Sequence, residues 1–438
     1  MSRNFSSSAE VFEWLSKFIN LERGQRPKSF RLERMEVLCE LAGHPQRCAP
    51  SIHIAGSKGK GSVTSMLSSM LTAAGFRAAR YMSPHVTDIR ERICLGDSFF
   101  DEDIYCSAGD ELRQVAEVLL PAAPDPLFDE CEPTFWELLT LLFFLCAQQA
   151  RCNIMVVETG MGGRLDSTNV LDPLVSVITL IELEHTAFLG NTITAVAGEK
   201  AGIIKPGKPL VLARQCDEAL EVFKNKAQEQ NSPLNYFPEI AELSDVNVLS
   251  HGTQFLYGDL RLTIAIPGKV QAENAALAIA ALKIAKLDVS EDAIRRGLAN
   301  LKIPARFEKI AEQPIFIIDG AHTPESFDLC VETFCSLYGE GGVLIFGCAA
   351  DKDPAAMAKT ASQHFSKIII TTPGTFKISD PVKVYEAFAA IAGKEKTELV
   401  PDTQEAVKQA MEISKPILGT GSFYLAAEIR KIVCNKFL

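Results

Sequence analysis

The chain has 438 residues, of which 47% are hydrophobic and 23% are charged, and its formal net charge is −11. This length predicts two or three domains, because one domain usually has about 100–200 residues. The composition is typical of a globular protein and excludes an intrinsically disordered one. The negative charge argues against a sequence-independent nucleic-acid binder, which would be basic, so we expect no nucleic-acid partner.

The start of the chain and its apolar segments lack the patterns of a signal peptide or a membrane span. No basic stretch followed by an apolar stretch opens the sequence. The longest apolar segment, residues 138–147, is interrupted by Thr140 and predicts a buried helix, because a span needs about 20 residues. The 12 cysteines include no CxxC pair and no zinc-ligand spacing. We expect a cytoplasmic monomer with reduced cysteines and no membrane contact.

A glycine-rich segment, residues 56–62, lies between a predicted strand and a predicted helix. The strand is the apolar run Ser51–Ala55, and the helix covers residues 60–74, with apolar residues at helical spacing. Glycines let backbone N–H groups turn toward an anion, and a helix N-terminus favours negative charge. The spacing differs from the common GxxxxGK[ST] form, but we predict a phosphate-binding loop rather than an ordinary turn. We expect Gly59, Lys60, Gly61 and Ser62 to contact the nucleotide. Lys60 would supply the positive charge that pairs with its phosphates.

Apolar runs and helical patterns alternate through the first two thirds of the chain. This alternation predicts an α/β domain with a largely parallel sheet. Residues 254–257 and 260–265 flank Gly258-Asp259, which predicts an antiparallel hairpin at the edge of this sheet. Further strands are predicted at residues 78–82, 153–158, 174–180 and 209–213, and later helices at residues 270–287 and 292–301.

A second α/β pattern begins after residues 303–305, an Ile-Pro-Ala segment that we interpret as a linker. We therefore predict two domains, residues 1–302 and 303–438, the second a small doubly wound domain. Its strands are predicted at residues 314–319, 342–347, 367–372, 398–401 and 416–419. Its helices are predicted at residues 324–338, 354–364, 381–391 and 403–413.

Several motifs follow one another in order along the chain. The longest is ETGMGGRLDSTN at residues 158–169. The others are the 56–62 loop, SPH at 83–85 with ER at 91–92, HT at 185–186, EKAGI at 199–203, DGAH at 319–322, DKD at 351–353 and GSF at 421–423. This series resembles the folylpolyglutamate synthase and dihydrofolate synthase branch of the Mur ligase superfamily. The resemblance implies a P-loop, Mur-ligase-like central domain with a mainly parallel sheet and a smaller, Rossmann-like α/β C-terminal domain.

The resemblance also implies an ATP-dependent ligase that adds L-glutamate to dihydropteroate, to reduced folates or to both. ATP would activate the acid as an acyl phosphate, which the amine of glutamate then attacks. The sequence leaves the accepted acid and the glutamate chain length open. A peptidoglycan-type Mur ligase is a rival, but it usually has a substantial extra domain before its P-loop, and here 55 residues precede Gly56. An uncoupled P-loop NTPase is a second rival, but it would not require a second nucleotide-facing domain. A pure binding module is disfavoured by the combination of metal ligands and a phosphate loop.

Polar residues are expected at the carboxyl edge of the first sheet, where open α/β folds bind ligands. By the resemblance, Ser83, Glu158 and His185 hold magnesium, which prefers oxygen ligands, and two ions are expected. Lys200 matches a lysine that the family carries as a carbamate, a further metal ligand. Read alone, Lys200 would be an unmodified lysine paired with Glu199 or another carboxylate. The implied catalytic residues are Lys60, His185 and Lys200.

The resemblance places the two substrates on other residues. Two of these residues also have a purely structural interpretation: Thr134 could be a helix N-cap, and Asn274 could be a capped or solvent-facing helix residue. The acid is implied at Thr134, Arg164 and Asp166, and ATP at Asn274, Arg306 and Asp319. Four residues depart from the family pattern: Lys58 and Thr323 replace asparagine, Ala305 replaces glycine and Glu184 replaces aspartate.

Overall fold

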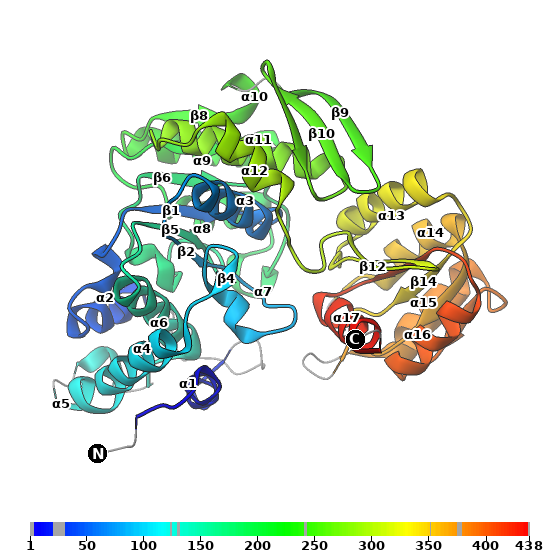
Figure 1. The fold of residues 1–438 in the computed structure, drawn as a ribbon, viewed down its shortest axis with the longest axis horizontal. Helices are drawn as coiled ribbons and strands as arrows, with labels where there is room; N and C mark the ends of the chain where they lie inside the picture. Colours follow the sequence, from blue (N-terminus) through cyan, green and yellow to red (C-terminus); the bar gives the residue numbers. More distant parts are fainter. Residues whose placement is uncertain are drawn as a thin grey trace.

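The structure is a computed structural model that describes residues 4–20, 31–122, 125–128, 132–240, 243–350, 352–374 and 379–436. The described strands form a large and a small sheet in the N-terminal part and one sheet in the C-terminal part (Figure 1). The predicted α/β class, with a mainly parallel central sheet and a separate C-terminal sheet, is confirmed.

The large sheet carries the glycine-rich segment at its centre. Its strands are β1 Ser51–Ala55, β2 Ala78–Tyr81, β3 Ile93–Leu95, β4 Ser98–Phe99, β5 Ile154–Glu158, β6 Val175–Ile178, β7 Leu210–Leu212 and β8 Leu234–Tyr236. Among the described residues their order is β4-β3-β2-β5-β1-β6-β7-β8. The strands from β2 to β8 in this order are parallel, and β3 and β4 add an antiparallel edge. β1 and β5 are buried along their whole length, as expected of central parallel strands.

Helices cover both faces of the large sheet. The longer ones are α1 Ser8–Leu15, α2 Leu32–Leu41, α3 Lys60–Ala73, α4 Glu102–Gln114, α6 Phe135–Gln149, α8 Ile193–Ala201, α9 Asp217–Glu229, α11 Lys269–Ile284 and α12 Glu291–Ala299. Side chains alternate along β5, so Met155 and Val157 face a core with α1, α2, α4 and α6, whereas Ile154 and Val156 face a core with α3, α11 and α12. The shorter ones are η2 Pro45–Arg47, η3 Ile89–Arg92, η4 Val115–Leu119, α5 Leu120–Ala122, η5 Pro126–Phe128, η6 Ser167–Val170, α7 Thr186–Leu189 and α10 Phe237–Ile240.

The apolar segment at residues 138–147 lies within α6. This helix is buried over nearly its whole length, which explains why it is apolar on all sides. In the part of the chain that the structure describes, no helix combines the length and apolarity of a membrane span.

The predicted hairpin is present, but its predicted place at the edge of the large sheet is wrong. β10 Gly252–Tyr257 and β11 Leu260–Ile264 pair antiparallel, and β9 Leu243–Leu249 joins β10 in a separate small sheet. Phe255 and Leu262 of this sheet share a core with α11 and α12. The hairpin has one apolar face. Packing that face against helices buries more apolar surface than pairing with β8 at the edge of the large sheet would.

The C-terminal sheet has the order β12-β13-β17-β14-β15-β16 among the described residues. Its strands are β12 Glu308–Glu312, β13 Ile315–Ile318, β14 Gly342–Phe346, β15 Phe365–Ile370, β16 Thr397–Leu399 and β17 Ile417–Thr420. Its helices are α13 Pro324–Tyr338, α14 Pro354–His364, α15 Pro381–Ala392, α16 Thr403–Glu412 and α17 Phe423–Lys436. Neither β12 nor α17 is predicted from the sequence. β12 is an antiparallel edge strand with little apolar surface, so it carries no strong strand signal.

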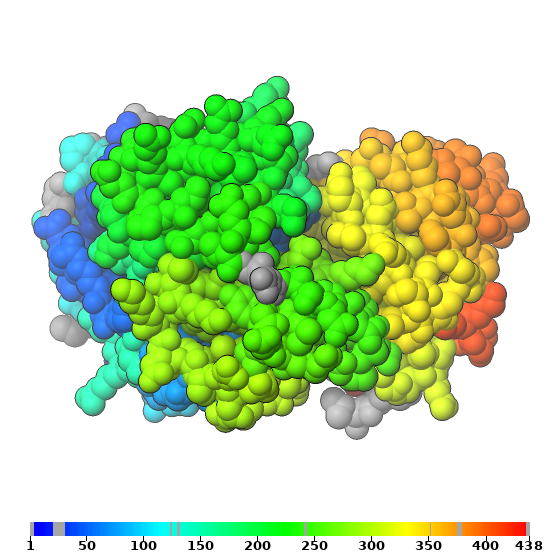
Figure 2. All heavy atoms as spheres, turned by 90° about the horizontal axis from the view of Figure 1, so that it is seen from above, coloured from blue at the N-terminus to red at the C-terminus, as the bar shows by residue number. Residues whose placement is uncertain are grey.

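The two parts of the molecule lie side by side (Figure 2). In the C-terminal part α13, α14 and α15 cover one face of the sheet, and α16 and α17 cover the other. Lys269 of α11 approaches Glu332 of α13 at 3.6 Å, and Val86 from the N-terminal part packs against the core under α16 and α17. The segment after β2 is therefore in direct contact with the C-terminal part.

Candidate functional site

The glycine-rich segment forms the turn between β1 and α3. Gly56 has a φ of +146°, and a Cβ atom on it would lie 1.8 Å from Thr179 Oγ1. Gly59 has a φ of +87°, and a Cβ atom there would lie 2.6 Å from Asn274 Oδ1 of α11. Both positions require glycine for backbone conformation and for space. α3 begins directly after this turn, at Lys60, so its N-terminal amide groups are available to an anion.

Two lysine side chains converge on the backbone carbonyl of Gly56. Lys60 Nζ donates to this oxygen at 2.7 Å, and Lys200 Nζ of α8 donates to it at 2.8 Å. Lys200 also pairs with Glu184 Oε1 at 2.7 Å, and Lys60 Nζ lies 4.0 Å from the same oxygen. The carboxylate paired with Lys200 is therefore Glu184 and not its chain neighbour Glu199.

The charges of this cluster shift one another's pKa. Burial lowers the pKa of Lys200 to about 8, and the Lys60 cation acts in the same direction. Burial opposes ionisation of Glu184, but Lys60 and Lys200 outweigh burial and lower the pKa of Glu184 to about 2. Glu184 is thus ionised at neutral pH, and Lys200 has a neutral fraction at mildly alkaline pH.

Glu158, the last residue of β5, lies beside the loop. It is 3% exposed, and its Oε2 accepts a hydrogen bond from Ser83 N at 3.4 Å. A Cβ atom on Gly61 would lie 3.5 Å from the same oxygen. Burial raises the pKa of Glu158 to about 7, although Lys60 and Arg306 act in the opposite direction. A buried carboxylate whose charge is so poorly compensated is a group that a divalent cation would stabilise.

His185 is the N-cap residue before α7 and has a left-handed backbone conformation, φ 47°. Such a conformation is uncommon for a residue other than glycine and is frequent at functional sites. His185 is an exposed residue, but neighbouring protein atoms still desolvate its imidazole and lower its pKa to about 4, with Glu184 opposing and Lys60 assisting. The imidazole is therefore neutral at physiological pH, the form that binds a metal. The Lys60 cation acts on the pKa of both groups, lowering that of His185 and opposing the rise in that of Glu158.

The motif at residues 158–169 packs against the C-terminal end of α8. A Cβ atom on Gly163 would lie 2.9 Å from Glu199 O, and one on Gly202 would lie 2.4 Å from Arg164 Cα. Arg164 N donates to Glu199 O at 2.7 Å, and its guanidinium pairs with Glu199 Oε1 at 2.8 Å. The side chain of Arg164 is 56% exposed, so it can reach a substrate in solution.

Asp166 is held by the loop that contains it. Its Oδ2 accepts from Met161 N at 2.9 Å, and its Oδ1 accepts from Thr168 N at 3.0 Å and from the Thr168 hydroxyl. Because the Thr168 proton goes to Asp166, His53 Nε2 must donate to Thr168 Oγ1, 2.8 Å away. These contacts give Asp166 a part in shaping the loop, and its contact with a substrate stays a prediction.

Thr134 occupies the N-cap of α6. Its hydroxyl accepts from Glu137 N at 3.3 Å, and its own N–H donates to Glu137 Oε2 at 2.7 Å, which forms a capping box. Glu137 also accepts from the buried Arg34 Nε at 2.8 Å. The helix-cap interpretation of Thr134 therefore describes these contacts, and a role in substrate binding stays a prediction.

The C-terminal part contributes Arg306 and Asp319. Asp319 follows β13 and accepts hydrogen bonds from Phe307 N at 2.8 Å and from Ala321 N at 2.7 Å. Burial raises the pKa of Asp319, and Arg306 opposes this effect. The guanidinium carbon of Arg306 lies 4.3 Å from the centroid of the Phe423 ring, a cation–π contact. The sequence does not predict Phe423 as a site residue, because only the tertiary structure brings the GSF motif onto Arg306.

Ala305, where the family usually has glycine, has a strained backbone conformation. It has a φ of 53°, in the left-handed region that favours glycine, and it is buried. An alanine there costs about 1–2 kcal/mol of backbone strain. Gly320 N donates to Ala305 O at 2.9 Å and helps to hold this conformation next to Arg306.

The other departures lie near the boundary between the two parts. Burial lowers the pKa of His322 to about 3, and Lys58 from the phosphate loop adds to this effect. Lys58 Nζ lies 3.9 Å from Glu182 Oε2. Thr323 is the N-cap residue of α13, and its N–H donates to Ser326 Oγ at 3.1 Å. Charges on the loop and on the C-terminal part therefore act on each other.

Asp351 of the DKD motif lies outside the described residues.

Two domain-family profiles match the chain. The Mur ligase middle domain matches residues 113–282, and the Mur ligase glutamate ligase domain matches residues 305–423. With the phosphate loop, these profiles define an ATP-dependent ligase of the Mur class.

Relatives and solved structures narrow this class. The chain is 31% identical to the dihydrofolate synthase/folylpolyglutamate synthase of Bacillus subtilis over 98% of this chain and 99% of the relative. It is 32% identical to the folylpolyglutamate synthase of Lacticaseibacillus casei over 91% and 93% of the two chains. The chain belongs to the folylpolyglutamate synthase/dihydrofolate synthase family.

The structural comparison gives the same result. The folylpolyglutamate synthase of Thermotoga maritima has a TM-score of 0.84 at 29% identity, covering 98% of this chain and 97% of that one. The ADP complex of the Mycobacterium tuberculosis enzyme has a TM-score of 0.87 at 27% identity, covering 98% of both chains. A complex of a folylpolyglutamate synthase with AMPPCP and folate has a TM-score of 0.84 at 29% identity, covering 97% and 99%.

Proposed function

We propose that this chain joins L-glutamate to dihydropteroate, to folates or to both, in folate biosynthesis, with hydrolysis of ATP to ADP and phosphate. The chain is an ATP-dependent glutamate ligase of the Mur class. The observation that carries the proposal is the cluster around the phosphate loop. There Lys60 from the N-terminal part and Arg306 from the C-terminal part both lower the pKa of Glu158, against the larger effect of burial. A ligase needs such a shared site because ATP and two further substrates must meet there.

ATP is assigned to the loop and to the facing C-terminal part. Gly59, Gly61 and Ser62 lie at the N-terminus of α3, where backbone N–H groups suit the phosphates. Lys60 supplies a cation that would stabilise the negative charge of the phosphoryl group during its transfer. The remaining nucleotide contacts are assigned to Arg306, to Asp319 and to Asn274, whose side chain occupies the space that a Cβ atom on Gly59 would need. We assign the two catalytic halves to residues 1–302 and 303–438.

The reaction is expected to run in two steps. A carboxylate oxygen of the acid attacks the γ-phosphorus of ATP, the bond to the bridging oxygen breaks, and ADP leaves. The amine of glutamate then attacks the acyl phosphate, the C–O bond breaks, a proton is released, and phosphate leaves with formation of the amide. Acyl phosphates hydrolyse in water, so approach of the two parts during turnover would protect the intermediate.

Two magnesium ions fit the residues at the loop. Glu158 is buried, and its pKa is raised to about 7 despite the opposing charges of Lys60 and Arg306, so a divalent cation would stabilise its ionised form. We assign Ser83, Glu158 and His185 as its ligands. Magnesium bound there would neutralise charge that develops on the transferring phosphate.

A carbamate on Lys200 is part of the same proposal. A neutral lysine amine attacks carbon dioxide and loses a proton, and the lowered pKa of Lys200, about 8, makes this form accessible. The product replaces a cation with an anion beside Glu184, so it requires a new positive charge at that place. A second magnesium ion would supply this charge and would gain an oxygen ligand.

The acid substrate is assigned to the loop that follows β5. The exposed guanidinium of Arg164 can pair with a substrate carboxylate in a bidentate way. We also assign Thr134 and Asp166 to the position of the pterin-bearing acid. We further predict that the protein is a cytoplasmic monomer.

Steady-state ADP release tests the proposal. Purified protein with Mg-ATP is assayed alone, then with glutamate plus dihydropteroate, and then with glutamate plus tetrahydrofolate. We expect fast ADP release only with an acid and glutamate together, with formation of one amide per ADP. Equal rates in all mixtures would identify an uncoupled NTPase, and turnover of only one acid would define the specificity.

A further inference from the structure

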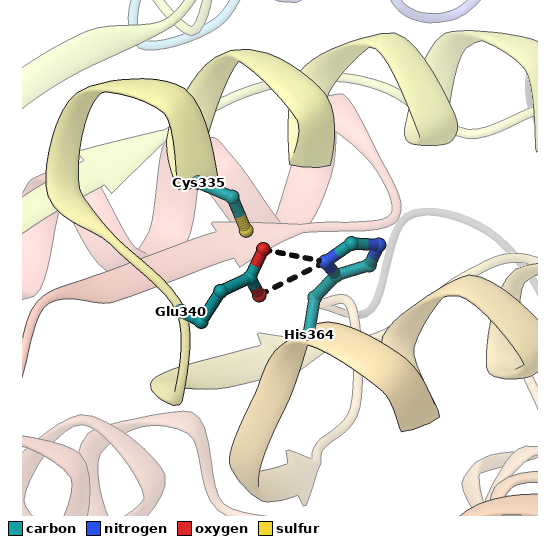
Figure 3. Close-up of side chains that lie close together, drawn as sticks. All are labelled: Cys335, Glu340 and His364. Atoms are coloured by element: carbon teal, nitrogen blue, oxygen red, sulfur yellow. Dashed lines mark hydrogen bonds and ion pairs between the residues drawn. The ribbon is translucent and has the colours of Figure 1, made fainter.

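A thiol, a carboxylate and an imidazole meet at one place in the C-terminal part (Figure 3). Cys335 comes from the last turn of α13, Glu340 from the following loop, and His364 from the end of α14. One ligand atom from each lies within 4.8 Å of the other two. His364 Nδ1 lies 2.9 Å from Glu340 Oε2 and 3.1 Å from Oε1. Cys335 and His364 are partly buried, and Glu340 is exposed.

The backbone fixes these three residues relative to one another. Glu340 stands between Gly339 and Gly341, which have φ values of 85° and 78°, so the chain turns sharply on both sides of it. Gly339 N donates to Cys335 O at 2.9 Å, and Gly341 N donates to His364 O at 2.8 Å. The loop that carries the carboxylate is thus hydrogen-bonded to the two other residues of the cluster.

The cluster also lies at the C-terminal ends of two helices. α13 has 15 residues and ends at Tyr338, and α14 has 11 residues and ends at His364. The C-terminus of each helix carries about half a negative charge from its free carbonyl groups. Together with the Glu340 carboxylate, these ends make the place favourable for a cation.

We propose that Cys335, Glu340 and His364 bind a divalent transition-metal ion, with zinc as the expected cation. Sulfur, nitrogen and carboxylate oxygen are the ligands of zinc, and three protein ligands leave one position for water. Tetrahedral zinc needs ligand atoms about 3.3–3.8 Å apart, a spacing within reach because the exposed Glu340 side chain can rotate. The sequence alone does not indicate the site, since the ligands do not follow a regular zinc-binding spacing.

Binding has a defined proton balance. Burial, with Glu340 assisting, raises the pKa of the Cys335 thiol to about 12, so the thiol keeps its proton until a cation displaces it. The metal–sulfur bond forms as this proton leaves to solvent. His364 Nδ1 donates to Glu340 in the metal-free cluster, so coordination through Nδ1 requires the neutral imidazole to give up this proton to solvent and take one at Nε2, with no net change. No oxidant or reductant takes part.

The place of the site in the sheet assigns it a structural role. Glu340 and His364 precede β14 and β15, at the amino edge of the C-terminal sheet. Asp319 follows β13, which is parallel to the central strands, so the nucleotide-facing residues lie at the opposite, carboxyl edge. The cation would tie the end of α13 to the end of α14 and would not enter the ligase reaction.

Cobalt titration of the full-length protein tests the proposal, with saturating magnesium present. Cobalt bound to a thiolate gives a near-ultraviolet charge-transfer band, and none of the residues assigned to magnesium is a cysteine. We expect one equivalent to bind with this band, zinc to displace it, and zinc to raise the melting temperature by about 2–5 °C. The variants Cys335→Ser, Glu340→Gln and His364→Gln should each bind at least about 10²-fold more weakly, beyond the effect of removing an outer-shell partner.

Matched variants carry the same changes elsewhere. Cys216→Ser and His251→Gln alter exposed residues outside the cluster and should keep the band and its affinity. Ligase activity with magnesium should be unchanged in Cys335→Ser, a measurement that also shows that the variant is folded. Absence of the band in the parent protein, or a band that survives Cys335→Ser, would overturn the proposal and leave a hydrogen-bonded cluster only.

Discussion

Replacing Glu158 with glutamine should stabilise the metal-free protein while it abolishes ligation. The glutamine has the same shape and keeps an oxygen that can accept from Ser83 N. It removes the buried negative charge that we assign to magnesium. Stability and activity should therefore change in opposite directions at this one position.

The size of the gain follows from the pKa of Glu158. Burial raises this pKa from 4.5 to about 7. Between these two values the unfolded chain has released the proton and the folded chain still holds it, so stability falls as the pH rises. One pH unit corresponds to about 1.36 kcal/mol, so the ionised, metal-free carboxylate costs about 3 kcal/mol above pH 7. Glu158→Gln should recover up to this amount at pH 8 and almost nothing at pH 4.5.

Denaturant unfolding in EDTA at pH 4.5, 6 and 8 measures this dependence. The parent protein should lose stability across the series relative to Glu158→Gln. Added magnesium should stabilise the parent at pH 8 and leave the variant nearly unchanged, because the cation binds the ionised carboxylate. Glu312→Gln, on the exposed edge strand β12, is the matched control and should change stability by less than about 0.5 kcal/mol.

Two results would refute the reasoning. One is a variant that is less stable than the parent at pH 8 without metal, which would mean that the Glu158 charge is already compensated. The other is a difference between variant and parent that does not depend on pH. Either result would also remove the main physical support for a magnesium site at Glu158.

Three further variants test other parts of the site. Lys60→Ala should lower kcat about 10²–10³-fold in a folded protein, because a cation about 4 Å from a phosphate contributes about 4 kcal/mol at an effective dielectric constant of 20. Lys58→Ala should lower kcat less. Steady-state kinetics measure both effects, and thermal melts show whether each variant is folded. Lys200→Ala should be nearly inactive, with partial rescue by short carboxylic acids, and high-resolution density that shows a bare amine in the active, bicarbonate-supplied enzyme would contradict the carbamate. Ala305→Gly should raise the free energy of unfolding by about 1 kcal/mol in denaturant titrations, because it removes left-handed strain, and a loss of stability would contradict that account.

Much of the fold could be predicted because its signals are local. The strand Ser51–Ala55 and the helices Pro324–Tyr338 and Pro354–His364 have the bounds that periodicity and prolines indicate. β12 could not be predicted, since a polar edge strand has little burial to mark it. The hairpin of β10 and β11 was visible as a hairpin, but its partners are α11 and α12, whose apolar surface is known only once they are packed.

The sequence by itself determined the family, the glycine-rich turn between β1 and α3 and the order of the motifs, because short segments with their own backbone chemistry carry these signals. Only the tertiary structure decided which charges meet. Lys200 reaches the carbonyl of Gly56, 144 residues earlier, and pairs with Glu184 instead of Glu199. Arg306 meets Phe423, and Cys335 meets Glu340 and His364, for the same reason. A side chain's partner depends on how distant strands and helices pack, and that packing sets burial and hence the pKa of each group.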